Sequence, residues 1–172
     1  MANSAPISRA PVAKNYLVTR NQAIRISPSN FTQFMTKNTV YGVIVDMPMA
    51  ANFITTMACY VNGAANLYFS NGGDFSGAAQ YYPGVVQAAR VLVSNAVSYL
   101  EDAEKTTSYP LPAGRTHFVY ILTTGGTYRL ALNATAANQD PKQRLLINLY
   151  QRVMNELHQA QMKDKAADAK NG

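Results

Sequence analysis

Residues 64–105 read AANLYFSNGGDFSGAAQYYPGVVQAARVLVSNAVSYLEDAEK and decide the fold that the sequence predicts. The stretch combines a short apolar strand at 65–70, a glycine-rich loop at 71–84 and a helix at 85–104. The helix is predicted because apolar residues recur at intervals of three and four, which is the period of a helix with a broad buried face. The rest of the chain is expected to pack around this strand and helix.

Four further strands are expected outside this stretch. Residues 39–47 are almost continuously apolar or β-branched, which is typical of a strand covered on both faces. Residues 53–61 follow as the next strand, and Asn-Gly at 62–63 is a typical type I′ hairpin turn that returns the chain to the strand at 65–70. Segments 116–123 and 127–134, joined by a Thr-Gly-Gly turn, indicate a second hairpin.

Two other helices complete the expected fold. A short helix near 30–38 has three apolar residues on one face, and a long last helix is expected from Asp140 to about residue 161. Asp140 can cap this last helix, and Pro141 at its first position loses no needed hydrogen bond. The sequence therefore predicts an α+β fold, in which a central, mainly antiparallel five-stranded sheet packs with two long helices and one short helix.

The chain of 172 residues is long enough for one domain, which we expect at 29–162. Residues 1–28 contain prolines, small polar residues and no clear period, so they are expected to form a disordered or extended basic arm. Within that arm, 16–26 can add an edge strand to the sheet. The charged, alanine-rich residues 163–172 are expected to form a disordered tail.

The formal net charge of +6 is concentrated at the two ends of the chain. Residues 1–40 carry +5, residues 142–172 carry +3, and the residues between them carry −2. A basic arm can bind phosphate by releasing counterions, but sparse charges of this kind are more typical of a solvated tail. We therefore do not expect nucleic acid as a partner.

Several classes of protein are not expected from this composition. The first sixteen residues lack the apolar core of a secretion signal, and the most apolar region, 40–69, is too often interrupted to span a membrane. A single cysteine, Cys59, excludes an intrachain disulfide framework and fits a reducing cytoplasm. The expected location is cytoplasmic.

The glycine-rich loop is the main candidate for a binding site. It ends near a helix N-terminus, where exposed amides and the helix dipole can hold the anion of a phosphate or nucleotide. The loop lacks the ending of a Walker phosphate loop, and a flexible strand-to-helix connection is the alternative. The candidate ligand-binding residues are Ser70, Asn71, Gly72, Gly73, Asp74, Ser76 and Gly77, with Tyr81 and Tyr82 flanking them and Asp46 as an additional acid.

Candidate catalytic groups are few. Asp46 lies in an apolar strand, where an aspartate needs a partner or hydrogen-bond donors, and it forms an acid/base pair only if it converges with Asp74. Cys59 shares a strand face with apolar residues and is expected in the core. His117 and His158 lack the ligand spacing of a zinc site, so we expect no metal and no cofactor.

The predicted order of elements resembles the profilin-like architecture of roadblock and longin domains. This resemblance covers about 30–161 and implies a central sheet whose helices serve dimerisation and scaffolding, although the extra strand before the middle helix departs from the simplest roadblock order. The segments YGVIVDMPM (41–49) and LYFSNGG (67–73) are similar to a family of small uncharacterised bacterial proteins. That similarity implies a bacterial cytoplasmic protein and no particular activity.

Three functions follow from these observations. The leading hypothesis is a non-catalytic protein-interaction or regulatory module that forms a homodimer through a sheet edge or the last helix. The alternative is a small-ligand binding protein that uses the loop at 70–84. The third is nucleic-acid binding through the basic arm.

Overall fold

An antiparallel sheet forms the centre of the computed structural model, which describes residues 12–35, 39–50, 53–133 and 140–171. Its seven strands follow the order β4-β3-β2-β1-β6-β7-β5. The α+β class and the antiparallel sheet are confirmed, but the sheet has seven strands and not five. The strands are β1 (Val40–Pro48), β2 (Ile54–Tyr60), β3 (Ala65–Phe69), β4 (Asp74–Phe75), β5 (Glu104–Thr106), β6 (Thr116–Thr123) and β7 (Gly126–Asn133).

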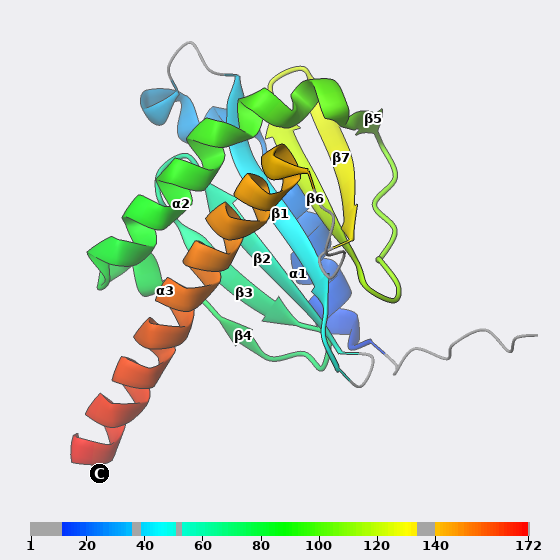
Figure 1. The fold of residues 1–172 in the computed structure, drawn as a ribbon. Coiled ribbons are helices and arrows are strands. Elements are labelled where there is room, and N and C mark those ends of the chain that lie inside the picture. Colours follow the sequence, from blue (N-terminus) through cyan, green and yellow to red (C-terminus); the bar gives the residue numbers. More distant parts are fainter. Residues whose placement is uncertain (1–11, 36–38, 51–52, 134–139, 172) are drawn as a thin grey trace, which may run out of the picture.

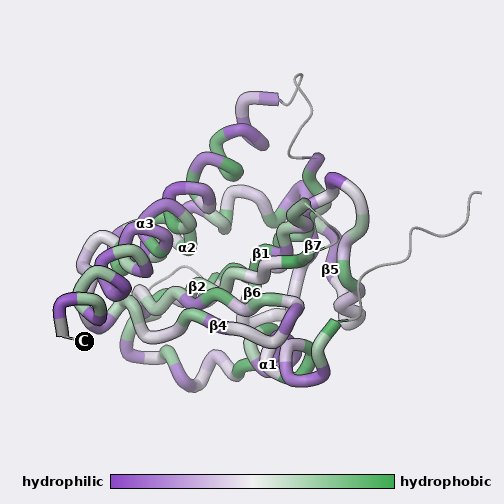
Figure 2. Tube along the Cα trace, turned by 90° about the horizontal axis from the view of Figure 1, so that it is seen from below, coloured by the Kyte–Doolittle hydropathy of each residue, from purple (hydrophilic) through white to green (hydrophobic). Residues whose placement is uncertain are grey.

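Helices cover both faces of the sheet, so the molecule has three layers (Figures 1 and 2). One face carries α2 (Pro83–Ala96) and α3 (Pro141–Asn171), and the other carries α1 (Lys14–Ile24) and the 3-10 helix η1 (Pro28–Phe34). Two short 3-10 helices flank α2, namely η3 (Ala78–Gln80) and η4 (Val97–Asp102). Within the described ranges, no helix is long and apolar enough to cross a membrane.

Strand β1 is central and is buried on both sides. After a register irregularity between Val40 and Gly42, its side chains alternate regularly between the two faces of the sheet. Val43 and Val45 join the core beneath α2 and α3, whereas Ile44 lies in the core on the α1 side. This two-sided burial is what the continuous apolar run predicts.

Helix α1 corrects the expected disordered arm. Residues 14–24 are helical, so the expectations of disorder and of an edge strand are both wrong for this segment. Because the buried face of α1 includes Arg20, the sequence lacks the regular spacing of apolar residues that predicts a helix. Residues 1–11 of the expected arm lie outside the described residues. The buried positions of α1 are Tyr16, Arg20, Ala23 and Ile24.

Other expected boundaries also change. The additional strands are β4, which lies inside the expected loop 71–84, and β5, which begins where the expected helix 85–104 ends. Helix α3 starts as predicted, because Asp140 Oδ1 accepts from Gln143 N at 2.9 Å. It also continues through 163–171, so the expected disordered tail is wrong there. Alanine has the highest helix propensity, and three alanines extend the helix without any buried stripe.

A buried ion pair fixes α1 on the sheet. Arg20 is 2% exposed and Asp46 is fully buried, and Arg20 Nη2 lies 2.7 Å from Asp46 Oδ2. Arg20 Nε donates to Asp46 Oδ1 at 3.1 Å, and the Thr56 hydroxyl donates to the same oxygen at 2.7 Å. The Tyr16 hydroxyl in turn lies 2.6 Å from the Thr56 hydroxyl. Because both charges are paired and hydrogen-bonded, this interior site tolerates them.

The same arginine holds the connection between β5 and β6. Arg20 Nη1 donates to the Tyr109 carbonyl at 2.9 Å, and Nη2 also donates to the Pro110 carbonyl at 3.3 Å. The Tyr120 hydroxyl donates to that Pro110 carbonyl at 2.9 Å. Arg20 therefore joins three segments that are far apart in the sequence: α1, β1 and the connection after β5.

We expect Asp46→Asn to lower the free energy of unfolding by about 3–5 kcal/mol, because the Arg20 guanidinium is then buried without its counter-charge. Urea denaturation at pH 7 measures this loss. The control is Lys142→Met, which removes exposed ion pairs to Glu101 and Asp102 and should have a much smaller effect. A loss for Asp46→Asn no larger than that of the control would contradict the structural role of the pair.

Candidate functional site

The first half of the glycine-rich loop forms the turn of the β3–β4 hairpin, and its polar groups are hydrogen-bonded to other groups of the chain. Ser70 is buried, and its hydroxyl oxygen accepts from Ile54 N at 3.0 Å while its own N–H donates to the Ile54 carbonyl at 2.9 Å. Asn71 Oδ1 accepts from Gly73 N at 3.0 Å. Gly72 has a φ of 101°, a left-handed conformation that favours glycine. These amides serve the turn and do not form an open cradle for phosphate.

The second half of the loop is also held by its own side chains. Ser76 Oγ donates to Asp74 Oδ2 at 2.9 Å, and Gly77 N donates to Asn66 Oδ1 at 3.1 Å. Gly77 has a φ of 82° and begins η3. The loop is therefore an ordered hairpin followed by a 3-10 turn. Several of its backbone N–H groups, including those of Gly72, Gly73 and Gly77, donate to acceptors within the chain.

Asp46 and Asp74 do not converge. In the sheet register Asp46 pairs with Thr56, Thr56 with Tyr68, and Tyr68 with Asp74, so the two carboxylates share one row and one face. Three strand spacings separate them, which is about 14 Å. Both carboxylate oxygens of Asp46 also accept hydrogen bonds from Arg20. The two acids are therefore not placed to share a proton or a substrate atom.

The N-terminus of α2 already faces a carboxylate of the chain itself. A Cβ placed on Gly84 would lie 2.5 Å from Glu156 Oε2, so the carboxylate of Glu156 on α3 lies close to the start of α2. The negative charge of Glu156 against the first turn of α2 is favoured by the helix dipole. An external anion at this helix end would have to displace it.

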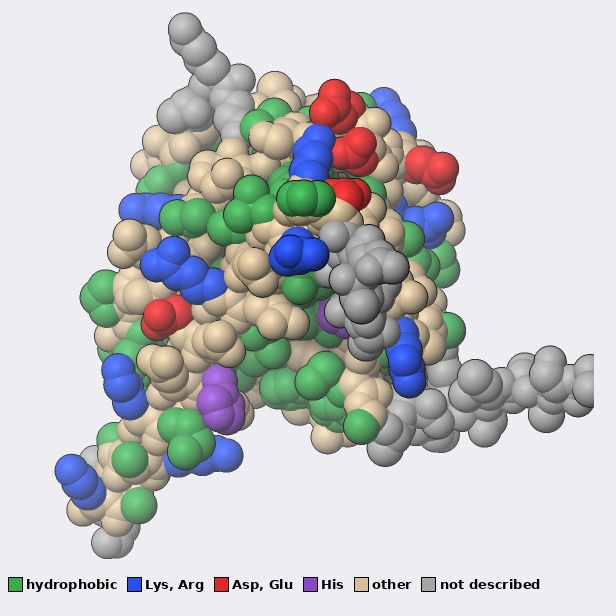
Figure 3. Space-filling model, in the orientation of Figure 1, with side chains coloured by type: hydrophobic (Ala, Val, Ile, Leu, Met, Phe, Trp, Pro, Cys, Tyr) green, Lys and Arg blue, Asp and Glu red, His purple; other side chains and the backbone are tan. Residues whose placement is uncertain are grey.

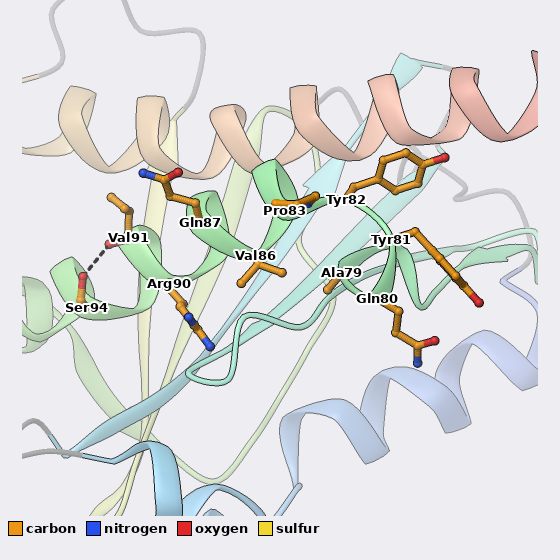
Figure 4. Close-up of a pocket in the computed structure, with 10 residues that line it drawn as sticks. All are labelled: Ala79, Gln80, Tyr81, Tyr82, Pro83, Val86, Gln87, Arg90, Val91 and Ser94. Carbon is orange, nitrogen blue, oxygen red and sulfur yellow. Dashed lines mark hydrogen bonds between the residues drawn. The ribbon is translucent and has the colours of Figure 1, made fainter.

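The two tyrosines before α2 have different environments. Tyr82 points toward α3 (Figure 4), where its hydroxyl donates to Asp164 Oδ1 and Lys163 Nζ lies 5.7 Å from its ring centre. The hydrogen bond to Asp164 raises the pKa of the Tyr82 phenol. Tyr81 is 76% exposed. Tyr82 therefore anchors the far half of α3, whereas Tyr81 belongs to the open surface.

A groove of about 620 Å³ runs along the outer side of η3 and α2 (Figure 4). Its lining is mainly apolar, with four polar side chains among the walls. Arg90 is the charged member, and its Nη2 donates to the Asn62 carbonyl at 3.3 Å, at the turn between β2 and β3. The groove residues are Ala79, Gln80, Tyr81, Tyr82, Pro83, Val86, Gln87, Arg90, Val91 and Ser94.

Five of the candidate residues line two separate pockets. Gly72, Gly73 and Asp74 line a small pocket against α1, whereas Tyr81 and Tyr82 line the groove along α2. The rest of the groove was not predicted from the sequence, because Val86 fits the apolar period of the buried helix face as well as that of an exposed groove. A signal was present in Gln87, Arg90 and Ser94, whose spacing of three and four marks an exposed helix side that runs on from the two tyrosines.

The remaining reactive side chains have structural environments. Cys59 is fully buried in the core, as predicted, and burial raises the pKa of its thiol. His117 Nδ1 lies 2.7 Å from the hydroxyl of Tyr150, a fully buried residue of α3. His158 is exposed. In the part of the chain that the structure describes, no three His, Cys, Asp or Glu side chains are grouped to hold a metal ion.

Comparisons with known proteins add no family. No family model matches the chain, and neither a curated protein nor a solved structure matches it. The resemblances to roadblock and longin domains and to small bacterial proteins therefore stay predictions. The geometry of the chain itself is the basis for its function.

We expect His117 to make stability depend on pH. Burial lowers the pKa of His117 in the folded chain, so the unfolded chain binds the proton more readily. The contribution of neutral His117 to the free energy of unfolding is therefore complete above the ordinary histidine pKa of about 6.5. It is lost as the pH falls from there through the lower pKa of the folded chain. Urea denaturation between neutral and mildly acidic pH should show a steeper loss for the native chain than for His117→Gln.

The matched control is His158→Gln, which changes an exposed histidine on α3. This variant should keep the native pH dependence of the free energy of unfolding. Equal slopes for the native chain and His117→Gln would contradict the assignment to His117.

Proposed function

We propose that this chain is a non-catalytic protein-interaction module that forms a homodimer through the groove along α2. The groove carries the proposal, because it combines a mainly apolar lining with a highly exposed aromatic side chain, Tyr81. Exposed aromatic residues next to apolar hollows are typical of protein interfaces. The two acids that the sequence offers as an acid/base pair do not support catalysis, since Asp46 is paired with Arg20 and lies three strands from Asp74.

The sheet edges and the last helix offer less surface for dimerisation. The edge strands β4 and β5 contain only two and three residues, and strands this short are poor templates for pairing with another sheet. The apolar stripe of α3 is buried against the protein's own core. Its buried members include Leu146, Tyr150, Val153, Leu157 and Ala160. The outer side of α2 is therefore the better candidate for a contact.

The groove is self-complementary for two antiparallel copies of α2. Tyr81 and Tyr82 lie at one end, and Arg90 and Val91 lie about two turns further along the helix. A two-fold axis near Val86 places the exposed Tyr81 of each copy against Arg90 and Val91 of the other. Guanidinium groups stack favourably on aromatic rings, so the cationic end of one groove matches the aromatic end of its partner.

The charge distribution around the groove also favours a second copy over nucleic acid. On the face that carries α2 and α3, basic side chains are scattered among polar and apolar ones rather than gathered into one patch (Figure 3). Phosphate-driven binding needs several closely spaced cations. Arg90 is the charged residue of the groove, and two-fold pairing keeps the two arginines of a dimer apart.

We expect a reversible dimer with a Kd in the micromolar range, because one helix and its flank cover less than the roughly 800 Å² per partner of a standard interface. Sedimentation velocity over a concentration series measures this constant. Arg90→Glu removes the cation–aromatic contact and should raise the Kd about tenfold or more. Tyr81→Ser should act in the same direction.

The matched control is Met49→Ser, which removes a half-exposed apolar side chain outside the groove and should leave the Kd unchanged. A chain that stays monomeric up to about 1 mM would contradict self-association. A dimer whose Kd does not respond to Arg90→Glu or Tyr81→Ser would place the contact elsewhere and contradict the role of the groove.

A further inference from the structure

A second, smaller pocket lies between the start of α1 and the hairpin of β3 and β4. Its volume is about 180 Å³. Two hydrogen bonds hold its walls together: Ala13 N donates to the Ser70 carbonyl at 2.8 Å, and Asn15 Nδ2 donates to the Gly72 carbonyl at 2.9 Å. The lining residues are Asn15, Tyr16, Thr19, Tyr68, Gly72, Gly73 and Asp74.

The charge of this pocket is negative. Asp74 is the acidic side chain among the described residues of its lining; it is exposed, and one of its two oxygens, Oδ2, accepts from Ser76. Of the basic residues of α1, Lys14 is exposed and does not belong to the lining, and Arg20 is paired with Asp46. A lone carboxylate repels phosphate and attracts a cation. The pocket therefore favours the opposite charge from the anion that the glycine-rich loop predicts.

The other polar groups of the lining are mostly able to accept hydrogen bonds. Asn15 has a side-chain carbonyl oxygen, while Thr19 and Tyr68 have hydroxyl oxygens, and a primary ammonium has three N–H donors to share among such acceptors and a carboxylate. Burial raises the pKa of Tyr68, so its phenol stays neutral at physiological pH. The Tyr16 hydroxyl is already bonded to Thr56, which leaves its ring as part of the wall.

We propose that this pocket binds a small primary ammonium, with Asp74 as its counter-ion and the rings of Tyr16 and Tyr68 against its carbon chain. A hard metal ion fits less well, because calcium takes six to eight oxygen ligands and the lining offers one carboxylate. The volume is below the roughly 300 Å³ at which drug-sized pockets begin, so the ligand has only a few carbon atoms. Aromatic faces beside a carboxylate are a favourable environment for an organic cation.

The site is independent of the proposed dimer, since it uses no residue of the groove along α2. Titration of the full chain with propylammonium chloride, followed by the amide NMR signals of Gly72, Gly73 and Asp74, tests it. We expect saturable shifts with a Kd of about 1 mM, given the few atoms of the probe. Propanol and propionate have nearly the same shape and should give no saturable shift, because they lack the positive charge.

Asp74→Asn preserves the shape of the side chain and should weaken binding of propylammonium at least about tenfold, because a charge-assisted hydrogen bond is lost. Thr19→Val should weaken it to a smaller extent. The matched control is Asp168→Asn, which neutralises an exposed acid on α3 and should not change the Kd. Native amide signals away from the pocket verify that each variant is folded.

Three results would overturn the proposal. The first is the absence of a saturable shift with propylammonium at matched chloride concentration. The second is equal binding by the native chain and Asp74→Asn. The third is saturable binding of propionate at the same amides, which would return the pocket to the anion hypothesis.

Discussion

The ion pair between Arg20 and Asp46 is the interaction on which the rest of the structure depends. A carboxylate on the central strand is costly to bury, and the sheet tolerates Asp46 only because α1 delivers a guanidinium to it. The same guanidinium binds the carbonyls of Tyr109 and Pro110. One charge pair thus positions the helix on one face of the sheet and the connection that leads into β6.

Several acidic side chains of this protein have structural partners within the chain. Asp46 holds α1, Glu156 lies against the start of α2, and Asp164 accepts from Tyr82 at the far half of α3. The amides of the glycine-rich loop close a hairpin. Two surfaces remain for function: the mainly apolar groove along α2, for which we propose a second copy as partner, and the small pocket between α1 and the β3–β4 hairpin, whose lining includes Asp74. The second of these is lined partly by α1, and the Arg20–Asp46 ion pair is one of the contacts that hold this helix on the sheet.

The sequence was informative where apolar periodicity was unbroken. The two-sided burial of β1, the core position of Cys59 and the Asp140 cap of α3 all follow from local patterns. Helix α1 was missed because its stripe contains Arg20, whose burial depends on a partner 26 residues away. The two shortest strands, β4 and β5, also have no pattern of their own, since two or three residues carry no period. The separation of the candidate residues into two pockets was not predicted for a similar reason. Which residues line a pocket, and therefore which charges it carries, depends on contacts between segments that are far apart in the sequence.

Hydrogen exchange on Arg20→Met tests most directly whether the charge pair, rather than apolar packing alone, holds α1. Methionine keeps a long apolar side chain at this position but removes every hydrogen bond that Arg20 donates to Asp46. If the charge pair holds α1, the amides of α1 exchange about tenfold faster or more in this variant, while those at the centre of β1 and β2 stay protected. Unchanged protection of α1 in this variant would contradict that role of the charge pair.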